Sequence, residues 1–224
     1  MPDSSPGSFP TAPPAVIVLA AGRGSRFTGD GHKLLQPFGA TDGTVLEHSI
    51  ANAVSTGLPV VLVTLSRLCD DRTPLGVETR VTLPEEGETG IGVSIAAGVR
   101  AARTAGGWLI LPGDMPLVRP ETIVRVAAAL HSGGTARALH RGLPGHPVAF
   151  ARKHYRHLVG LREDVGARDL LASHPPQLIE TEDAGTTLDI DTVADLDRLR
   201  NLDLTPPGFT LTECMMQDLR HRSS

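Results

Sequence analysis

The residues best suited to chemistry stand together near the N-terminus. Residues 16–19 are apolar and mostly β-branched, which predicts a short buried strand, and residues 20–24 are mainly alanine and glycine. A glycine-containing loop after a strand leaves backbone N–H groups free to face an anion. Arg26 offers a planar fork for phosphate oxygens, and Lys33 offers a mobile point charge. We therefore expect this stretch to bind a polyphosphate.

Two common phosphate-binding motifs do not match the stretch. A Walker loop needs lysine directly after its second glycine, but Gly29 is followed by Asp30. The dinucleotide fingerprint G-x-G-x-x-G fits at Gly22 and Gly24 but has Phe27 at the third glycine position. That mismatch disfavours an NAD-type oxidoreductase.

The remaining pattern, L-A-A-G-x-G-x-R-F with Lys33 downstream, resembles nucleotidyltransferases with a Rossmann-like fold. In detail it resembles the molybdenum cofactor cytidylyltransferase branch of the molybdopterin nucleotidyltransferases. The plainer alternative is a glycine turn with solvated basic side chains. Residues 28–32 look like an insertion before Lys33, so the resemblance does not fix the path of this loop. The resemblance implies catalytic roles for Arg26 and Lys33, which would neutralise charge on a leaving pyrophosphate. The nucleotide-binding residues that we expect are Leu19, Ala20, Ala21, Gly22, Arg23, Gly24, Thr89 and Ser94.

Asp114 follows a second buried strand, within the segment G-D-M-P. In a parallel sheet, ligands bind at the carboxyl ends of the strands, which is where this side chain is expected. Mg²⁺ is commonly held by one or two carboxylates together with substrate phosphates. The alternative is an ordinary turn, because aspartate next to glycine and proline is frequent in loops.

A second acidic segment, L-D-I-D-T, precedes an acidic helix. Asp191 or Thr192 could simply cap that helix. Alternatively, a carboxylate from this segment joins Asp114 in a two-sided magnesium clamp. The resemblance favours Asp114 and Asp191 as metal ligands, with Asp189 beside them on the acceptor side. Whether Asp189 or Asp191 is the second ligand stays open at this point.

Three further positions match the family pattern. Ser94 stands near the start of an alanine-rich helix, either as its cap or in the nucleotide-base pocket. His146 lies in G-H-P-V-x-F, a segment that lines the acceptor side in the family. Arg168 would grip the acceptor's phosphate with its planar fork, the alternative being a surface arginine.

Length and composition fit one compact enzyme. The chain has 224 residues and a net charge of −4, so neither a second core nor a basic field for nucleic acid is expected. Aromatic residues make up only 3%, which leaves few rings to stack on bases. Cys69 and Cys214 form no C-x-x-C pair, so we expect no disulfide framework and no zinc site. No apolar run suits a membrane span, and a cytoplasmic location is expected.

Strand-like and helix-like segments alternate along the chain, which predicts a single α/β domain of three layers. We expect a Rossmann-like, mostly parallel sheet of the nucleotidyltransferase type. The predicted strands are residues 16–19, 59–65, 77–83, 108–111 and 177–182, and the predicted helices are 44–56, 93–103, 121–130, 153–161, 167–174 and 192–199. Residues 136–139 and 147–150 form short apolar stretches. We expect a disordered segment at 1–14, the domain at 15–200 and an extension at 201–224 that could form a short helix.

These expectations combine into one hypothesis: Mg²⁺-dependent nucleotidyl transfer from a nucleoside triphosphate to a phosphomonoester, with release of pyrophosphate. The resemblance implies that the nucleotide is CTP and that the acceptor is molybdopterin or its molybdenum form. It also implies a molybdoenzyme or its maturation chaperone as a protein partner. One rival is a transferase that uses GTP or another triphosphate with a phosphorylated sugar or alcohol. Another rival is a non-catalytic nucleotide-binding protein that handles the cofactor.

Overall fold

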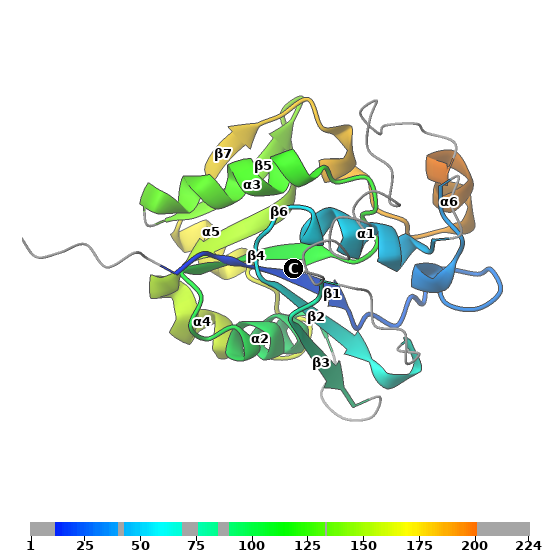
Figure 1. Ribbon diagram of the computed structural model, residues 1–224, viewed down its shortest axis with the longest axis horizontal. Helices are drawn as coiled ribbons and strands as arrows, with labels where there is room; N and C mark the ends of the chain where they lie inside the picture. Colours follow the sequence, from blue (N-terminus) through cyan, green and yellow to red (C-terminus); the bar gives the residue numbers. More distant parts are fainter. Residues whose placement is uncertain (1–11, 40–42, 69–75, 85–89, 133, 201–224) are drawn as a thin grey trace, which may run out of the picture.

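The computed structural model describes residues 12–39, 43–68, 76–84, 90–132 and 134–200, which build a seven-stranded sheet (Figure 1). The strands are β1 (Ala15–Ala20), β2 (Val60–Leu65), β3 (Thr79–Leu83), β4 (Gly107–Pro112), β5 (Thr135–His140), β6 (Leu143–Ala151) and β7 (Gln177–Glu180). Their order is β3-β2-β1-β4-β6-β5-β7, and only β6 runs antiparallel to its neighbours. The predicted single α/β domain with a mostly parallel sheet is confirmed.

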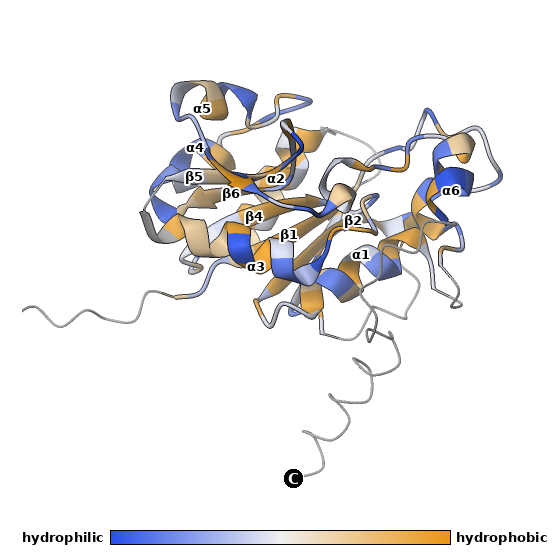
Figure 2. Ribbon diagram, turned by 90° about the horizontal axis from the view of Figure 1, so that it is seen from above, coloured by the Kyte–Doolittle hydropathy of each residue, from blue (hydrophilic) through white to orange (hydrophobic). Residues whose placement is uncertain are grey.

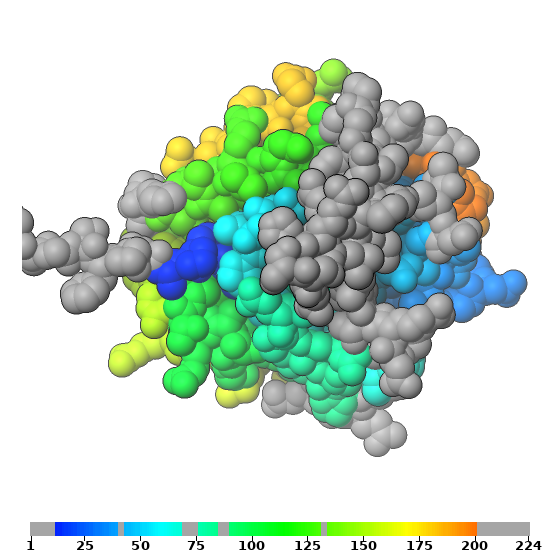
Figure 3. Space-filling model, viewed as in Figure 1, coloured from blue at the N-terminus to red at the C-terminus, as the bar shows by residue number. Residues whose placement is uncertain are grey.

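Helices cover both faces of the sheet. Figure 2 shows α2, α4 and α5 on one side of the strands and α1 and α3 on the other. The helices are α1 (Val45–Val54), α2 (Ile91–Ala101), α3 (Pro120–Ala128), α4 (Tyr155–Val159), α5 (Arg168–Ser173) and α6 (Val193–Arg200). Helices α1 and α3 contact each other, and in the space-filling view the green surface of α3 adjoins the cyan surface at the end of α1 (Figure 3). None of the helices described is long and apolar enough to cross a membrane.

The alternation of side chains along β1 explains why both faces need helices. Val16 and Val18 are fully buried on one face, in a core shared with α1 and α3. Ile17 is fully buried on the other face, where it packs in a cluster with Val99 of α2. A strand buried on both faces reads as a continuous apolar run, which is how this one appears in the sequence.

The hairpin of β5 and β6 is the main departure from the expected elements. Arg141 and Gly142 both have positive φ, at 49° and 79°, which are the conformations that a tight two-residue hairpin turn requires. The turn sends β6 back between β4 and β5, where it pairs antiparallel with both. Because Arg141 is an unusual residue for such a turn, the sequence predicts only two short apolar stretches here.

Several expectations concern residues outside the described ranges. Residues 1–11 of the N-terminal segment and the whole extension at 201–224 belong to this group, as do Thr89, Cys69 and Cys214. These expectations remain predictions.

Candidate active site

The glycine loop that follows β1 is held in place by His32. The His32 Nε2 atom lies 3.0 Å from the carbonyl oxygen of Gly22, and the Leu34 N–H donates to His32 Nδ1 over 3.2 Å. Because Nδ1 accepts, Nε2 carries the proton and donates to Gly22. Burial lowers the pKa of His32, which favours this neutral form. The segment read as an insertion before Lys33 therefore includes a residue that supports the loop.

Lys33 stands between two carboxylates that are far away in the sequence. Its Nζ donates to Asp114 Oδ2 over 2.7 Å and to Asp191 Oδ1 over 2.8 Å. Only 11% of the lysine side chain is exposed. Burial lowers the pKa of Lys33, but the attraction of the two carboxylates outweighs it, so the pKa ends above its usual value. The lysine is therefore charged near neutral pH.

Asp114 is positioned by close packing of the backbone at the ends of β1 and β4. The Gly113 N–H donates to the Leu19 carbonyl over 2.8 Å, and Ser49 Oγ donates to the Gly113 carbonyl over 2.9 Å. A Cβ atom at Gly113 would lie 3.0 Å from that Leu19 oxygen and from Leu46 Cδ1, so a larger residue would disturb the contact. The carboxylate faces Lys33.

Asp191 is brought to the same place by the buried side chain before it. Ile190 is fully buried, and its N–H donates to the Asp114 carbonyl over 3.0 Å. The start of α6 is capped by Thr192, whose Oγ1 accepts from the Asp195 N–H, while Asp195 Oδ2 accepts from the Thr192 N–H. Thr192 rather than Asp191 is thus the cap, which leaves Asp191 to pair with Lys33 and Arg26.

The charges around the two aspartates of this segment differ. The hydrogen bond from Lys33 lowers the pKa of Asp191, so this side chain stays ionised. Partial burial raises the pKa of Asp189, and the negative charges of Asp114 and Asp191 raise it further. Between Asp189 and Asp191, it is Asp191 that faces Lys33.

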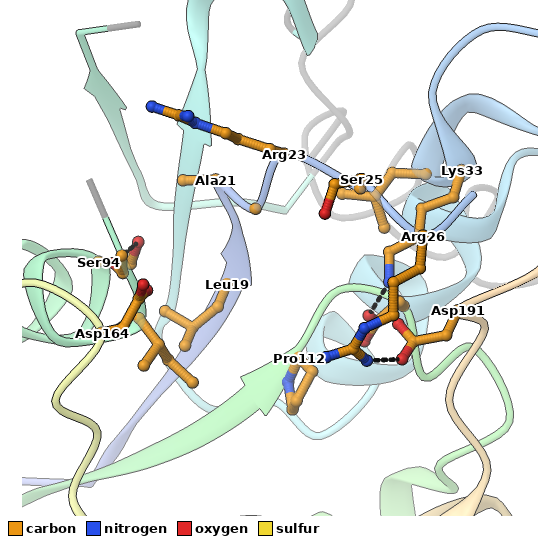
Figure 4. A pocket seen from close by; sticks show the side chains of 16 residues that line it. Leu19, Ala21, Arg23, Ser25, Arg26, Lys33, Ser94, Pro112, Asp164 and Asp191 are labelled. Carbon is orange, nitrogen blue, oxygen red and sulfur yellow. Dashed lines mark hydrogen bonds and ion pairs between the residues drawn. The ribbon is translucent and has the colours of Figure 1, made fainter. Parts of the chain in front are cut away.

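These groups line a pocket of about 460 Å³ at the carboxyl ends of β1 and β4. Figure 4 shows Lys33, Arg26 and Asp191 at one end, and Ser94 at the other. Ten of the predicted site residues line it: Leu19, Ala21, Gly22, Arg23, Gly24, Arg26, Lys33, Ser94, Asp114 and Asp191. Ala20, the last residue of β1, does not line it.

The unpaired oxygen of Asp114 is the observation that bears on a metal. Asp114 Oδ1 is buried and has no hydrogen-bond partner. A buried oxygen of this kind destabilises the fold unless a donor or a cation binds it. In the described part of the chain no group of three or more His, Cys, Asp or Glu side chains is arranged to hold a metal by itself. Two carboxylates beside the glycine loop fit an ion that takes its remaining ligands from phosphates and water, as Mg²⁺ does.

Ser94 does not cap α2. It is the fourth residue of the helix, and its Oγ donates to the carbonyl of Gly90, the N-cap residue, over 3.0 Å. The cap interpretation is therefore wrong; Ser94 lines the pocket, and its contact with a nucleotide base remains a prediction.

The three residues expected on the acceptor side do not line this pocket. The His146 Nδ1 atom lies 3.3 Å from the Ile110 carbonyl, and burial lowers the pKa of this histidine. Arg168 is exposed at the start of α5, and Asp189, the residue before Ile190, is only partly buried. Their roles remain predictions.

Neither His32, which contacts the glycine loop of the pocket, nor Asp164, which lines the pocket, was predicted from the sequence as a site residue. His32 supports the glycine loop through contacts that only the folded chain makes. Asp164 lines the pocket next to Ser94, although it lies on the loop before α5. The sequence signal that could have identified Asp164 is its place in the same short segment as Arg168, a predicted site residue.

Comparison with known proteins agrees with this geometry. Residues 16–178 match the model of a family described as "MobA-like NTP transferase domain". The chain belongs to this family. The match includes the glycine loop, Lys33 and Asp114, and it ends before Asp191.

Individual relatives of this MobA-like NTP transferase differ in their names. The chain is 30% identical to the molybdenum cofactor cytidylyltransferase of Escherichia coli over 182 residues. The aligned region covers 80% of this chain and 91% of that protein. It is 32% identical over 149 residues to the bifunctional protein GlmU of Kineococcus radiotolerans, covering 64% of this chain but only 30% of the relative.

Solved structures show the same fold. The crystal structure of Rv0371c from Mycobacterium tuberculosis superposes with a TM-score of 0.71 at 26% identity, covering 85% of this chain and all (100%) of the other. A second crystal structure of Rv0371c, a complex with manganese, has a TM-score of 0.69 at 27% identity and covers 86% of this chain and 100% of the other.

Proposed function

We propose that this MobA-like NTP transferase joins a nucleoside monophosphate, taken from CTP, to the phosphate of molybdopterin or its molybdenum form. The observation that carries the proposal is the pairing of one lysine with two carboxylates from distant loops, directly beside the glycine loop. A protein that only binds nucleotide has less need of both carboxylates. The identity to the E. coli cytidylyltransferase supports CTP and this acceptor.

The residues of the chain supply binding and charge neutralisation. Backbone N–H groups of residues 21–24 would hold the triphosphate, in a loop that His32 supports. Arg26 has a side chain that is 78% exposed, so it can turn from Asp191 to the phosphates. Lys33 stays charged and lies where negative charge grows on the departing pyrophosphate.

The reaction needs no strong general base, because the attacking oxygen belongs to a phosphate that is already anionic. This oxygen bonds to the α-phosphorus while the bond to the β-phosphate oxygen breaks, and pyrophosphate leaves with that electron pair. Asp114 and Asp191 would hold Mg²⁺, which supplies positive charge to the reacting phosphates. The crystal structure of Rv0371c with manganese supports a divalent cation in this fold.

The test is magnesium-dependent pyrophosphate release, with each of the four ribonucleoside triphosphates offered with molybdopterin and with a panel of phosphorylated sugars and alcohols. Release with CTP and molybdopterin alone supports the full proposal. Release with another pair keeps the reaction and rejects the substrates. Nucleotide binding without release from any pair supports the non-catalytic alternative.

Protein partners follow from the same proposal. A molybdoenzyme or its maturation chaperone would receive the completed cofactor. Co-purification of such a protein with the full chain, lost on competition with excess free chain, is the corresponding test.

A further inference from the structure

The loop of residues 162–165 is fixed on the first turn of α2. The Gly92 N–H donates to the Glu163 carbonyl over 2.9 Å. A Cβ atom at Gly90 would lie 2.3 Å from that carbonyl group, and one at Gly92 would lie 2.5 Å from the Val165 oxygen. The two backbones therefore touch so closely that only glycine fits at both helix positions.

The same loop holds a residue in an unfavourable conformation. Glu163 has φ of 47°, in the left-handed region that residues other than glycine, asparagine and aspartate rarely adopt. Such a conformation persists only where the surroundings enforce it, and it is frequent at binding sites. The next residue, Asp164, lines the pocket.

Figure 4 shows Asp164 beside Ser94 and Leu19, at the end of the pocket away from Lys33 and Asp191. Among the residues that the structure describes, none forms a hydrogen bond or ion pair with the Asp164 side chain. Its two oxygens are thus available to a ligand.

This end of the pocket offers hydrogen-bond acceptors at Asp164 and Ser94, and the guanidinium of Arg23, which also lines the pocket, lies apart from both in Figure 4. The Gly92 N–H at the start of α2 is already occupied by Glu163, and the Ser94 hydroxyl donates to Gly90, so that its oxygen can only accept. A phosphate placed here would be repelled by the Asp164 carboxylate. The group that fits is uncharged and carries two adjacent donors.

We propose that Asp164 is a specificity residue that accepts two hydrogen bonds from adjacent neutral donors of a substrate. The inference rests on the proposed function, because it assumes that the triphosphate occupies the opposite end of the pocket. Two sources have this chemistry: the 2′,3′-diol of the nucleotide's ribose, and the N–H and amino edge of a heterocycle such as a pterin. A charge-assisted pair of this kind discriminates strongly against an analogue that lacks one donor.

The first arm of the test measures binding to the full chain without turnover, by calorimetry with Mg²⁺ and α,β-methylene CTP or its 2′-deoxy form. If the ribose is the source, the wild type binds the ribo form about ten-fold more tightly, and Asp164→Ala removes this preference. The second arm measures pyrophosphate release at varied acceptor. If the acceptor is the source, Asp164→Ala raises its KM about ten-fold, leaves kcat largely unchanged and does not alter nucleotide binding.

Asp169→Ala is the matched control, since it removes another exposed carboxylate from the same segment, outside the pocket. If Asp164→Ala behaves like Asp169→Ala in both arms while the wild type binds nucleotide and releases pyrophosphate, the inference is wrong and the proposed function stands. A wild type that binds no nucleotide would overturn both. Circular dichroism of both variants checks that they are folded.

Discussion

Removal of Asp114 should separate stability from activity. In Asp114→Ala the chain loses the hydrogen bond from Lys33 Nζ, 2.7 Å long, but Lys33 keeps its partner Asp191 at 2.8 Å. The substitution also removes the buried Oδ1 atom, which has no partner. A hydrogen bond to a charged group contributes about 1.5–3 kcal/mol, and an unsatisfied buried polar atom costs about 1–3 kcal/mol. The two effects largely cancel, so the free energy of unfolding should change by no more than about 1 kcal/mol.

Activity should respond very differently to the same change. If Asp114 helps to hold the cation that neutralises the reacting phosphates, kcat/KM should fall by about 10³-fold, equivalent to about 4 kcal/mol. Lys33→Met is the informative contrast, because it leaves both oxygens of Asp114 without a cation. Breaking a buried pair in this way costs about 3–5 kcal/mol, so this variant should be clearly less stable.

The assays are urea denaturation followed by circular dichroism and magnesium-dependent pyrophosphate release. Asp197→Ala serves as the control, since that carboxylate lies on α6 with 67% of its side chain exposed. Substantial turnover by a folded Asp114→Ala variant would refute the metal assignment. A loss of more than about 3 kcal/mol in stability would refute the reasoning about the unpaired oxygen.

Three further predictions concern other parts of the fold. His32→Asn should keep an acceptor for the Leu34 N–H but lose the contact with Gly22, so the KM for nucleotide in the pyrophosphate assay should rise several-fold at nearly unchanged stability. Burial lowers the pKa of His154, and the unfolded chain therefore binds its proton more readily. The contribution of His154 to stability is complete above about pH 6.5 and is lost as the pH falls toward the lower pKa of the folded state. The melting temperature should therefore fall over this pH range, and His154→Gln should reduce that fall. Thr122→Val removes a donor 2.7 Å from the buried Asp183 carboxylate, which should cost about 1.5–3 kcal/mol in urea denaturation.

The parts of the site that follow buried strands were predictable from sequence. The apolar run of β1 and the small residues after it place the glycine loop, and the apolar run of β4 places Asp114. In a parallel sheet, local patterns of this kind fix the edge at which such loops meet. The residue that caps α6 was not predictable, because the sequence allows either Asp191 or Thr192 in that place. The structure identifies Thr192 as the cap, because it exchanges hydrogen bonds with Asp195.

Other features depend on tertiary contacts that no local pattern encodes. His32 supports the glycine loop only because η1 (Lys33–Leu35) folds back against it. Asp164 reaches the pocket because its loop packs on α2, some 70 residues earlier in the chain, through glycines that look ordinary in the sequence. The reversed strand β6 depends on a turn with arginine at a left-handed position, which residue preferences do not anticipate.

The distance along the chain between the partners of Lys33 has a consequence for synthesis on the ribosome. Asp114 follows the lysine by 81 positions, but Asp191 follows it by 158. A growing polypeptide that has been made as far as Asp114, just after β4, has the glycine loop and the first acid, but the ammonium group of Lys33 then has only one of its two counterions. The second arrives after β5, β6 and β7 have been made. Competence for chemistry is therefore acquired late in translation, when the growing chain can already close its sheet.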